Sequence, residues 1–260
     1  MLQDFWADLH IHTALSPCAG KDMTPQGIIH RAEALGIKLI AVTDHNSAEN
    51  VPSLVKASLG GKVLVLPGME VQTREEVHLI CLFEKTDLAV AWQEKVYAHL
   101  PSALNNERLF GTQWLFDSSD RRVGSLDRLL LTSTSLSLEE VIEGVSIIGG
   151  ICIPAHVDRP SYSLISNLGF IPQNLQVAAL ELSPKCRPAS FRKLHPEAAG
   201  INVVISSDAH WLEAMGPPQT CLRLKELTWQ EIKLALAGAE GREVVVIDDK
   251  GLSNSTLFTE

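Results

Sequence analysis

Histidine and acidic residues recur in this sequence at the points where short apolar runs end. The runs at residues 5–11, 38–43, 64–69, 151–155 and 203–207 are each closed or followed by such residues. Several of these runs are apolar without alternation, which is typical of strands buried on both faces. In a barrel of parallel strands, residues just past the C-terminal ends converge at one mouth. We therefore expect one shared site built from His10, His12, His45, Glu70, His156, Asp208 and His210.

His78 differs from this group because it precedes its apolar run instead of following it. A hairpin explains the difference: residues 68–71 form one arm, 72–76 a polar turn and 77–83 an antiparallel return strand. This geometry brings His78 back to the rim beside Glu70. We predict that the two side chains share an ion.

These residue types indicate a metal centre. Imidazole and carboxylate groups are the ligands of Zn, Mn and Fe sites, whereas the cysteine spacing excludes a tetrathiolate zinc site. The side chains of His10 and His12 face the same side of a strand, so they can bind one ion. Eight ligand-type residues exceed what one tetrahedral ion uses, which predicts two or three divalent ions. Glu70 is suited to bridge two of them.

Strand-like runs alternate with helix signals along the chain. Thr24 precedes a proline, and a glutamate stands three residues after Ser137 and after Thr228, so all three hydroxyl residues are expected to begin helices. This alternation predicts an α/β fold with a mostly parallel sheet or barrel. The expected strands lie at residues 5–11, 38–43, 63–66, 77–83, 150–154, 177–182, 203–206 and 244–247.

The number of expected strands fits a single barrel domain over residues 1–260, and no linker or internal repeat divides it. Residues 89–136 interrupt the alternation with polar stretches at 105–107 and 117–122. We expect this segment to be an insertion over the barrel mouth.

The composition is that of an ordinary globular protein, with 45% hydrophobic and 20% charged residues. A formal charge of −9 argues against a broad electrostatic contact with nucleic acid, although bound cations would supply positive charge locally. Five Trp and two Tyr give no evident stacking platform for long single strands. The composition therefore favours small phosphates or very short oligonucleotides, with no extended nucleic-acid surface.

The cysteines and the N-terminal sequence bear on location. The five cysteines are scattered and lack a C-x-x-C pair, so a disulfide framework is not expected. The N-terminal sequence has no basic region followed by an apolar stretch, and the longest apolar run, residues 145–155, is far short of the ~20 residues that span a bilayer. We expect a soluble, cytoplasmic protein without a membrane segment.

Six motifs follow one another across the chain: DLHIHT at 8–13, TDHNS at 43–47, PGME at 67–70, the isolated His78, PAHVDRP at 154–160 and SSDAH at 206–210. In this order the sequence resembles the PHP (polymerase and histidinol phosphatase) family. The resemblance implies a distorted seven-stranded β/α barrel with up to three metals at the C-terminal ends of its strands. It also implies that the ligands are His10, His12, His45, Glu70, His78, His156, Asp208 and His210.

One position departs from the family pattern. Many members place an aspartate five residues after the second histidine of the H-x-H motif, where this chain has Pro17. Cys18 or Asp22 would replace that ligand, unless one metal site is weak or completed by water. A Cys18 thiolate would favour a softer metal such as Zn or Fe.

Other residues near the motifs have two readings each. Arg159 is a candidate phosphate clamp because its planar guanidinium fits phosphate, and the alternative is a salt bridge to Asp158 or another acid. Glu181 is a candidate substrate contact or general acid. Asp8 and Asp44 either hold the second nitrogen of a ligating histidine or cap a turn. Lys185 and Arg187 share the ambiguity of Arg159, and His30, His99 and His195 are expected at the surface.

The resulting hypothesis is a metal-dependent phosphoesterase. Hydroxide generated at the ions would attack the phosphorus of a small phosphate ester, with Arg159 neutralising charge and Asp208 or water carrying a proton. The substrates that the resemblance allows are a phosphomonoester, a nucleoside bisphosphate or a short oligonucleotide. The alternatives are a non-catalytic metal-binding PHP module and an amidohydrolase-type C–N hydrolase, whose usual bridging lysine is not apparent here.

Overall fold

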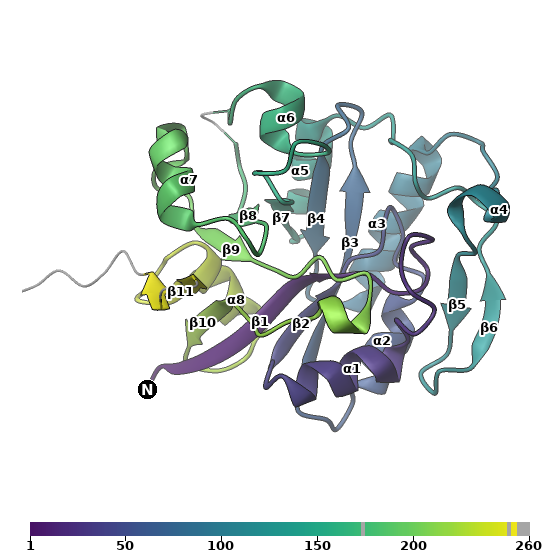
Figure 1. The fold of residues 1–260 in the computed structure, drawn as a ribbon, viewed down its shortest axis with the longest axis horizontal. Helices are drawn as coiled ribbons and strands as arrows, with labels where there is room; N and C mark the ends of the chain where they lie inside the picture. The colour runs from purple at the N-terminus through teal and green to yellow at the C-terminus, as the bar shows by residue number, and fades with distance from the viewer. Residues whose placement is uncertain (173–174, 249–250, 254–260) are drawn as a thin grey trace, which may run out of the picture.

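The computed structural model describes residues 1–172, 175–248 and 251–253, and its centre is a curled sheet of eight strands (Figure 1). The strands of this sheet lie in the order β12-β11-β10-β1-β2-β3-β4-β7, and the pairs β8–β9 and β5–β6 lie outside it. The strands are β1 (Gln3–Ile11), β2 (Leu39–Val42), β3 (Leu64–Gln72), β4 (His78–Leu82), β5 (Trp114–Phe116), β6 (Arg122–Ser125), β7 (Ile151–Pro154), β8 (Leu180–Leu182), β9 (Val203–Ile205), β10 (Thr220–Leu224), β11 (Glu243–Asp248) and β12 (Gly251–Ser253).

Strand direction differs in part from the expectation. Within the described residues, β1–β2, β2–β3 and β8–β9 are parallel, whereas β3–β4, β4–β7, β1–β10, β10–β11 and β11–β12 are antiparallel. The α/β class is confirmed, but the expectation of a mostly parallel sheet is wrong. The short hairpin after β3 reverses β4 and so makes the pairs β3–β4 and β4–β7 antiparallel, because a parallel neighbour needs a long crossover and a hairpin does not.

The antiparallel pairs still leave the strand ends at one mouth. Strand β7 is antiparallel to β4, which is itself antiparallel to β3, so β1, β2, β3 and β7 all run in the same direction. Their C-terminal ends therefore meet at the same edge of the sheet, and the first residue of β4 returns to that edge. These strand ends therefore meet at one edge, as the apolar runs predict, although the sheet contains both parallel and antiparallel pairs.

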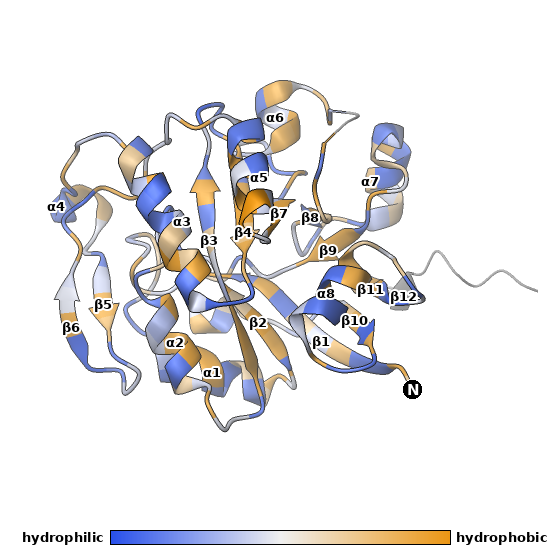
Figure 2. Ribbon diagram, turned by 180° about the vertical axis from the view of Figure 1, so that it is seen from behind, coloured by the Kyte–Doolittle hydropathy of each residue, from blue (hydrophilic) through white to orange (hydrophobic). Residues whose placement is uncertain are grey.

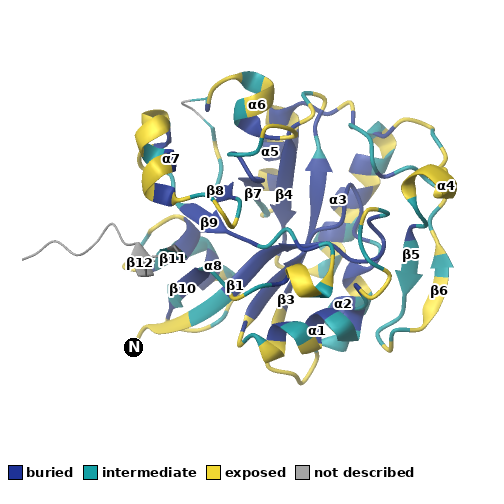
Figure 3. Cartoon of the chain, viewed as in Figure 1, coloured by how far each residue is buried: buried dark blue, intermediate teal, exposed yellow. Residues whose placement is uncertain are grey.

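Helices cover the sheet and complete its core. The helices are α1 (Pro25–Ala34), α2 (Val51–Ala57), α3 (Thr86–His99), α4 (Glu107–Phe110), α5 (Leu138–Ile147), α6 (Leu164–Leu168), α7 (Pro188–Leu194) and α8 (Trp229–Leu236), with short 3-10 turns at Pro196–Ala198 and Leu212–Ala214. Ile28, Leu54, Trp92 and Val141 extend from four of these helices into one buried cluster. The central strands are hydrophobic and buried, whereas α4 and much of α7 are exposed (Figures 2 and 3).

Two of the three expected helix caps are formed by side chains. The Thr24 hydroxyl accepts a hydrogen bond from the backbone N–H of Gly27, and Ser137 forms the full capping box with Glu140. Thr228 precedes α8 but its side chain makes no cap hydrogen bond. The glutamate of that pattern, Glu231, instead accepts hydrogen bonds from Arg242 and from the backbone of Lys225, so the expected capping box is absent there.

The segment from residue 89 to 136 has two parts. Its first part belongs to α3, which packs Trp92 and Val96 into the core. Its later part contains α4 and the β5–β6 hairpin, and Phe110 lines the cavity at the mouth. The insertion over the mouth stays a prediction for this later part. Among the described residues, no helix combines the length and apolar character needed to cross a bilayer.

Candidate metal centre

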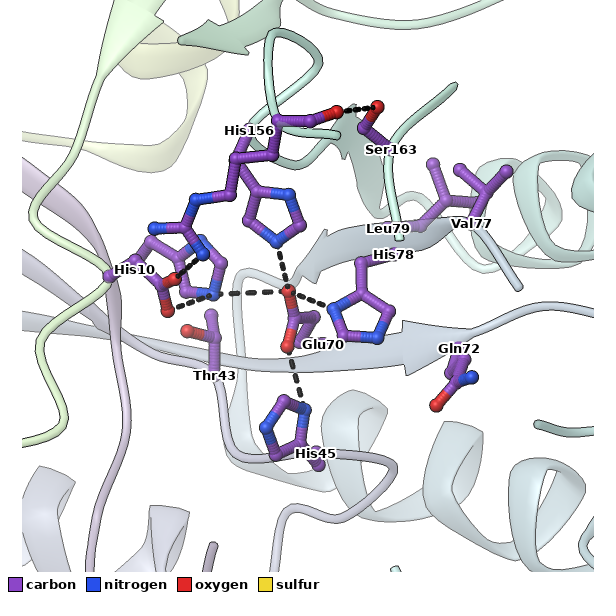
Figure 4. A network of polar contacts seen from close by, with 12 residues as sticks. His10, Thr43, His45, Glu70, Gln72, Val77, His78, Leu79, His156 and Ser163 are labelled. Atoms are coloured by element: carbon purple, nitrogen blue, oxygen red, sulfur yellow. Dashed lines mark hydrogen bonds and ion pairs between the residues drawn. The ribbon is translucent and has the colours of Figure 1, made fainter. Parts of the chain in front are cut away.

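Glu70 lies buried at the centre of a group of imidazoles (Figure 4). It is carried by β3, and the imidazoles come from four other segments of the chain. Ligands of a shared ion lie about 3 Å apart, since each is ~2 Å from the metal. The nitrogens around Oε1 are His78 Nδ1 at 2.9 Å, His10 Nε2 at 3.3 Å and His156 Nε2 at 3.3 Å, and those around Oε2 are His45 Nδ1 at 2.7 Å and His12 Nε2 at 3.6 Å. Both oxygens of Glu70 are thus placed as in a carboxylate that bridges ions.

Asp208 forms a second focus beside Glu70. Its Oδ1 lies 3.1 Å from His12 Nε2 and 3.3 Å from His10 Nε2, and 3.6 Å from His210 Nδ1. Within the described part of the chain, three triads place their ligand atoms within 4.8 Å of one another: His12, His45 and His210; His10, His12 and Asp208; and His45, Glu70 and His78. Together with His156, these are all eight residues expected from the sequence. The structure brings them together, and their role as ligands stays a prediction.

The predicted hairpin is confirmed and explains the position of His78. Strands β3 and β4 pair antiparallel with Gln72 opposite His78 and Glu70 opposite Ile80. His78 therefore begins the return strand at the level where β3 ends, and its ring turns toward Glu70. The single histidine that was out of phase in the sequence joins the same site through this turn.

Strained backbone is concentrated near this mouth. Of the seven non-glycine residues described with positive φ, four lie in or beside the site: His156 at 32°, Asp208 at 49°, Asn46 at 51° and Tyr162 at 55°. Such conformations cost of the order of 1–3 kcal/mol each and persist where the surrounding structure enforces them. Their concentration is typical of a functional site.

The Glu181 carboxylate contacts His10 at the ring nitrogen that does not face Glu70 and Asp208. Its Oε2 lies 2.9 Å from His10 Nδ1 and accepts the backbone N–H of His156 at 3.0 Å. Since Nδ1 faces a carboxylate, it carries the proton and leaves Nε2 free to face Glu70 and Asp208. The expectation that Glu181 contacts substrate or acts as a general acid is wrong, because its carboxylate is buried behind the ring and does not line the cavity.

Asp44 and Asp8, each expected either to hold a histidine nitrogen or to cap a turn, have different roles in the structure. Asp44 accepts hydrogen bonds from Thr13 and from the Ser16 hydroxyl, and the Ser16 oxygen lies 3.0 Å from His12 Nδ1. Asp44 thus acts on an imidazole only through Ser16. Asp8 accepts the backbone N–H of Ser207 at 3.0 Å and contacts no imidazole, so it has the capping role. Burial raises the pKa of Asp8 to about 6, against the opposing hydrogen bonds from Ser207.

The charges in the centre depend on one another. Burial alone would raise the pKa of Glu70, but the surrounding imidazoles of His78, His10 and His45 hold it well below its ordinary value. The pKa of Asp208 is likewise held well below its ordinary value, because His10 and His12 outweigh its burial. Both carboxylates are therefore ionised at neutral pH, as metal ligands must be.

Arg159 borders the cavity in front of the centre. Its Nη1 lies 2.6 Å from Asp208 Oδ2, so the salt bridge is made to Asp208 and not to neighbouring Asp158, which accepts hydrogen bonds from Ser183. The cavity has a volume of about 420 Å³ and is lined by His45, Glu70, Gln72, His78, Phe110, Leu131, His156, Arg159, Ser161, Tyr162, Asp208 and His210. Lys185 and Arg187 are exposed and do not line it, so their expected role as a phosphate clamp is not supported.

Cys18 lies next to the centre. Burial would raise the pKa of its thiol, but hydrogen bonds with the imidazoles of His210 and His45 lower that pKa to about 6. Cys18 and Asp22 are both exposed. Of these two candidates for the ligand absent at Pro17, Cys18 is the one with hydrogen bonds to proposed ligands, and its role as a ligand stays a prediction. Of the histidines expected at the surface, His30 is exposed, His99 and His195 are half-buried, and none lines the cavity.

Sequence reasoning missed Ser16, Phe110 and Tyr162. Ser16 stands four residues after His12, and a relay from Asp44 through its hydroxyl leaves no spacing signature. Tyr162 stacks on His78 with ring centroids 4.9 Å apart, a contact between segments far apart in the chain. No signal in the sequence identified Phe110.

A curled α/β barrel that gathers histidines and carboxylates at the ends of its strands defines the class of fold to which this chain belongs. A model of the PHP domain matches residues 8–163, which is more than half of the chain. The chain is therefore a member of the PHP domain family, and the expected distorted barrel of the PHP type is confirmed.

Known proteins resemble the chain over parts of their length. The 5′-3′ exoribonuclease Rnm of Escherichia coli (strain K12) is 32% identical over 80 residues, which cover 29% of this chain and 26% of Rnm. Endonuclease PfuEndoQ from Pyrococcus furiosus, described as lesion-specific, superposes with a TM-score of 0.69 at 22% identity over 93% of this chain and 58% of its own. A putative metal-dependent phosphoesterase from Bifidobacterium adolescentis superposes with a TM-score of 0.54 at 19% identity, over 81% of this chain and 89% of its own. The chain thus spans about a quarter of Rnm and less than two thirds of PfuEndoQ.

Proposed function

We propose that this protein is a metal-dependent phosphoesterase. The observation that carries the proposal is the position of Glu70, whose two carboxylate oxygens face imidazole nitrogens from five histidines at 2.7–3.6 Å. A carboxylate surrounded in this way is suited to hold two ions side by side. Pairs of ions clamp phosphate esters in many hydrolases, because they neutralise both the attacking and the leaving oxygen.

The buried polar atoms fit such ions. Glu70 Oε2 and Asp208 Oδ1 are buried and make no hydrogen bond of good geometry within the described residues, although imidazole nitrogens lie within 3.6 Å of each. Buried polar atoms in proteins are normally paired, so atoms that face a common point without bonding to one another indicate a cation there. The donor set of imidazole and carboxylate suits Zn, Mn or Fe, and two or three ions match the three triads.

Each residue of the site has a role in the proposed reaction. His10, His12, His45, His78, His156, His210, Glu70 and Asp208 would hold the metal ions. When bound, such ions provide a nucleophile at neutral pH by lowering the pKa of water, and they neutralise charge on phosphoryl oxygens. Arg159 would bind a phosphoryl oxygen from the cavity side. Asp208 Oδ2, now paired with Arg159, would accept or return a proton during departure of the alcohol.

The substrate that we propose is the phosphate ester of a nucleotide or a short oligonucleotide. Rnm and PfuEndoQ are both named as nucleases, which favours nucleic-acid esters over other phosphate esters. A cavity of about 420 Å³ has the size of a small-molecule site. We also propose a cytoplasmic location, because Cys81 and Cys152 are free thiols although their sulfurs lie 4.0 Å apart.

The test uses metal-depleted protein reconstituted with Mn²⁺, Zn²⁺ or Fe²⁺ and a panel of phosphomonoesters, nucleoside bisphosphates and dinucleotides. We expect hydrolysis that requires the metal, is abolished by Glu70→Gln and is unchanged by His195→Ala, a histidine that contacts Glu197 away from the cavity. Bound metal without hydrolysis of any ester would identify a non-catalytic module. Hydrolysis of amide substrates alone would identify a C–N hydrolase.

A further inference from the structure

Two aromatic rings border the cavity in front of the candidate metal centre. Phe110 ends α4, and Tyr162 lies in the turn after β7, so the rings come from unrelated segments of the chain. Their exposed fractions are 39% and 47%. We call this pair the aromatic rim. A single exposed ring on a protein surface is ordinary, but two rings that line one cavity can each offer a face to a planar apolar group.

Tyr162 is held in a fixed orientation. Its carbonyl accepts the backbone N–H of His78 at 3.0 Å, and its ring stacks on the His78 ring with an interplanar angle of 21°. Its backbone has a φ of 55°, a conformation that tyrosine rarely adopts. A ring that is already ordered loses little freedom when a ligand stacks on it. The part of Tyr162 that does not cover His78 remains available to the cavity.

The same cavity holds a group suited to phosphate. Arg159 stands three residues before Tyr162 and lines the cavity with it. In a nucleotide only the sugar separates the phosphate from a planar base, so one nucleotide can contact the guanidinium and the aromatic rim together. We infer that Phe110 and Tyr162 bind the unpaired base that adjoins the scissile phosphate of a nucleotide or short single strand.

This inference rests on the proposed function and narrows its substrate. The net charge of −9 provides no basic track for a long strand, so base stacking must supply affinity that the backbone contacts do not. Stacking tolerates any base because each has a π-face. The low Trp and Tyr content argued only against a stacking platform for long single strands, and two rings suffice for one base.

The experiment compares a dinucleotide with the same dinucleotide lacking the base beside the scissile phosphate. The metal-loaded variants are Tyr162→Ala, Tyr162→Phe and Phe110→Ala, and the control is Phe170→Ala, because Phe170 is 57% exposed and does not line the cavity. We expect removal of the base to lower kcat/KM of the wild type by about 5- to 150-fold, the scale of one stacking contact. Tyr162→Ala should show a similar loss on the intact dinucleotide and none on the abasic one, while Tyr162→Phe retains the preference.

Equal losses of Tyr162→Ala on both dinucleotides, with metal content retained, would overturn the inference, because Tyr162 would then only shield His78. If the wild type hydrolyses neither dinucleotide, calorimetric binding of the two dinucleotides to the metal-loaded protein decides the inference, and the full panel of phosphate esters decides the proposed function separately. Tighter binding of the intact dinucleotide that Tyr162→Ala removes would support the aromatic rim. Equal affinities in the wild type would reject it.

Discussion

Glu181 offers a sharp test of how the candidate metal centre is built. Its carboxylate contacts His10 Nδ1 and the backbone N–H of His156, and it lies on β8, outside the eight-stranded sheet that carries His10. Replacing Glu181 with alanine removes both hydrogen bonds and leaves every proposed ligand in the chain. The variant therefore separates orientation of a ligand from its presence.

The magnitude follows from the hydrogen bond to the ring. A hydrogen bond to a charged partner contributes about 1.5–3 kcal/mol, and each 1.4 kcal/mol corresponds to a factor of ten in affinity. If the bond to His10 orients the ring for metal, Glu181→Ala should bind metal about 10- to 100-fold more weakly, the scale on which outer partners of ligating histidines act. The unpaired N–H of His156 should also lower the free energy of unfolding by about 1–3 kcal/mol.

The assay is competition for Mn²⁺ or Zn²⁺ with a chromophoric chelator, together with chemical unfolding of the metal-free protein. Glu181→Gln keeps one acceptor oxygen and should fall between alanine and the wild type. Glu231→Gln is the matched control, because Glu231 is another buried carboxylate with an arginine and a backbone donor, away from the cavity. If Glu181→Ala binds metal as tightly as the wild type while losing only stability, then Glu181 does not orient His10 as a ligand and its role is structural.

Three further predictions follow from the charges of the molecule. Arg159→Ala should keep its metal and its fold but lose roughly 2–4 kcal/mol of transition-state binding, and Arg159→Lys should recover part of this loss. Asp208→Ala should instead lose metal and turnover together, which metal analysis beside kcat/KM distinguishes. Wild-type rates in Arg159→Ala would refute the proposal that Arg159 binds the phosphate. Although burial opposes it, neighbouring carboxylates raise the pKa of His10 and His45 well above the ordinary value. Calorimetry in buffers of different ionisation enthalpy should therefore show release of protons when the metal-free protein binds metal, and zero release would contradict this. Hydrogen bonds from Arg242 and Lys225 lower the pKa of Glu231 to about 2, so the stability that its carboxylate gives the fold is present above pH 4.5 and is lost as the pH falls toward 2. In Glu231→Gln the free energy of unfolding, measured with denaturant, should depend less steeply on pH in this range. An unchanged pH dependence would contradict this.

The positions of the proposed ligands were predictable because they depend on phase within a strand. His10 and Glu70 lie near the C-terminal ends of their strands, and Asp208 lies just past the end of β9. Strand ends that point the same way meet at one edge whatever the remaining pairs do. His78 was predictable for the opposite reason, since a residue before its run fits only a reversed strand. The apolar pattern of each strand is local in the sequence, so all eight proposed ligands could be named without knowing which strands pair.

Pairing and packing between distant segments were not predictable in the same way. Strand direction depends on partners far along the chain, which is why a sheet expected to be mostly parallel is mixed and why β10 was not expected. Glu181 contacts His10 across 171 positions, and no spacing rule relates them. The pattern at Thr228 was present, but Arg242 takes the glutamate that a capping box requires.

The most direct test of the central claim is the number of metal equivalents that the metal-depleted protein needs for hydrolysis of a dinucleotide. Titration with Mn²⁺, with bound metal and rate measured on the same samples, follows both quantities. If Glu70 bridges ions, the rate should stay near zero through the first equivalent and reach its maximum with the second or third. Full activity at one equivalent, or activity that survives excess chelator, would contradict a multinuclear centre at the mouth of this barrel.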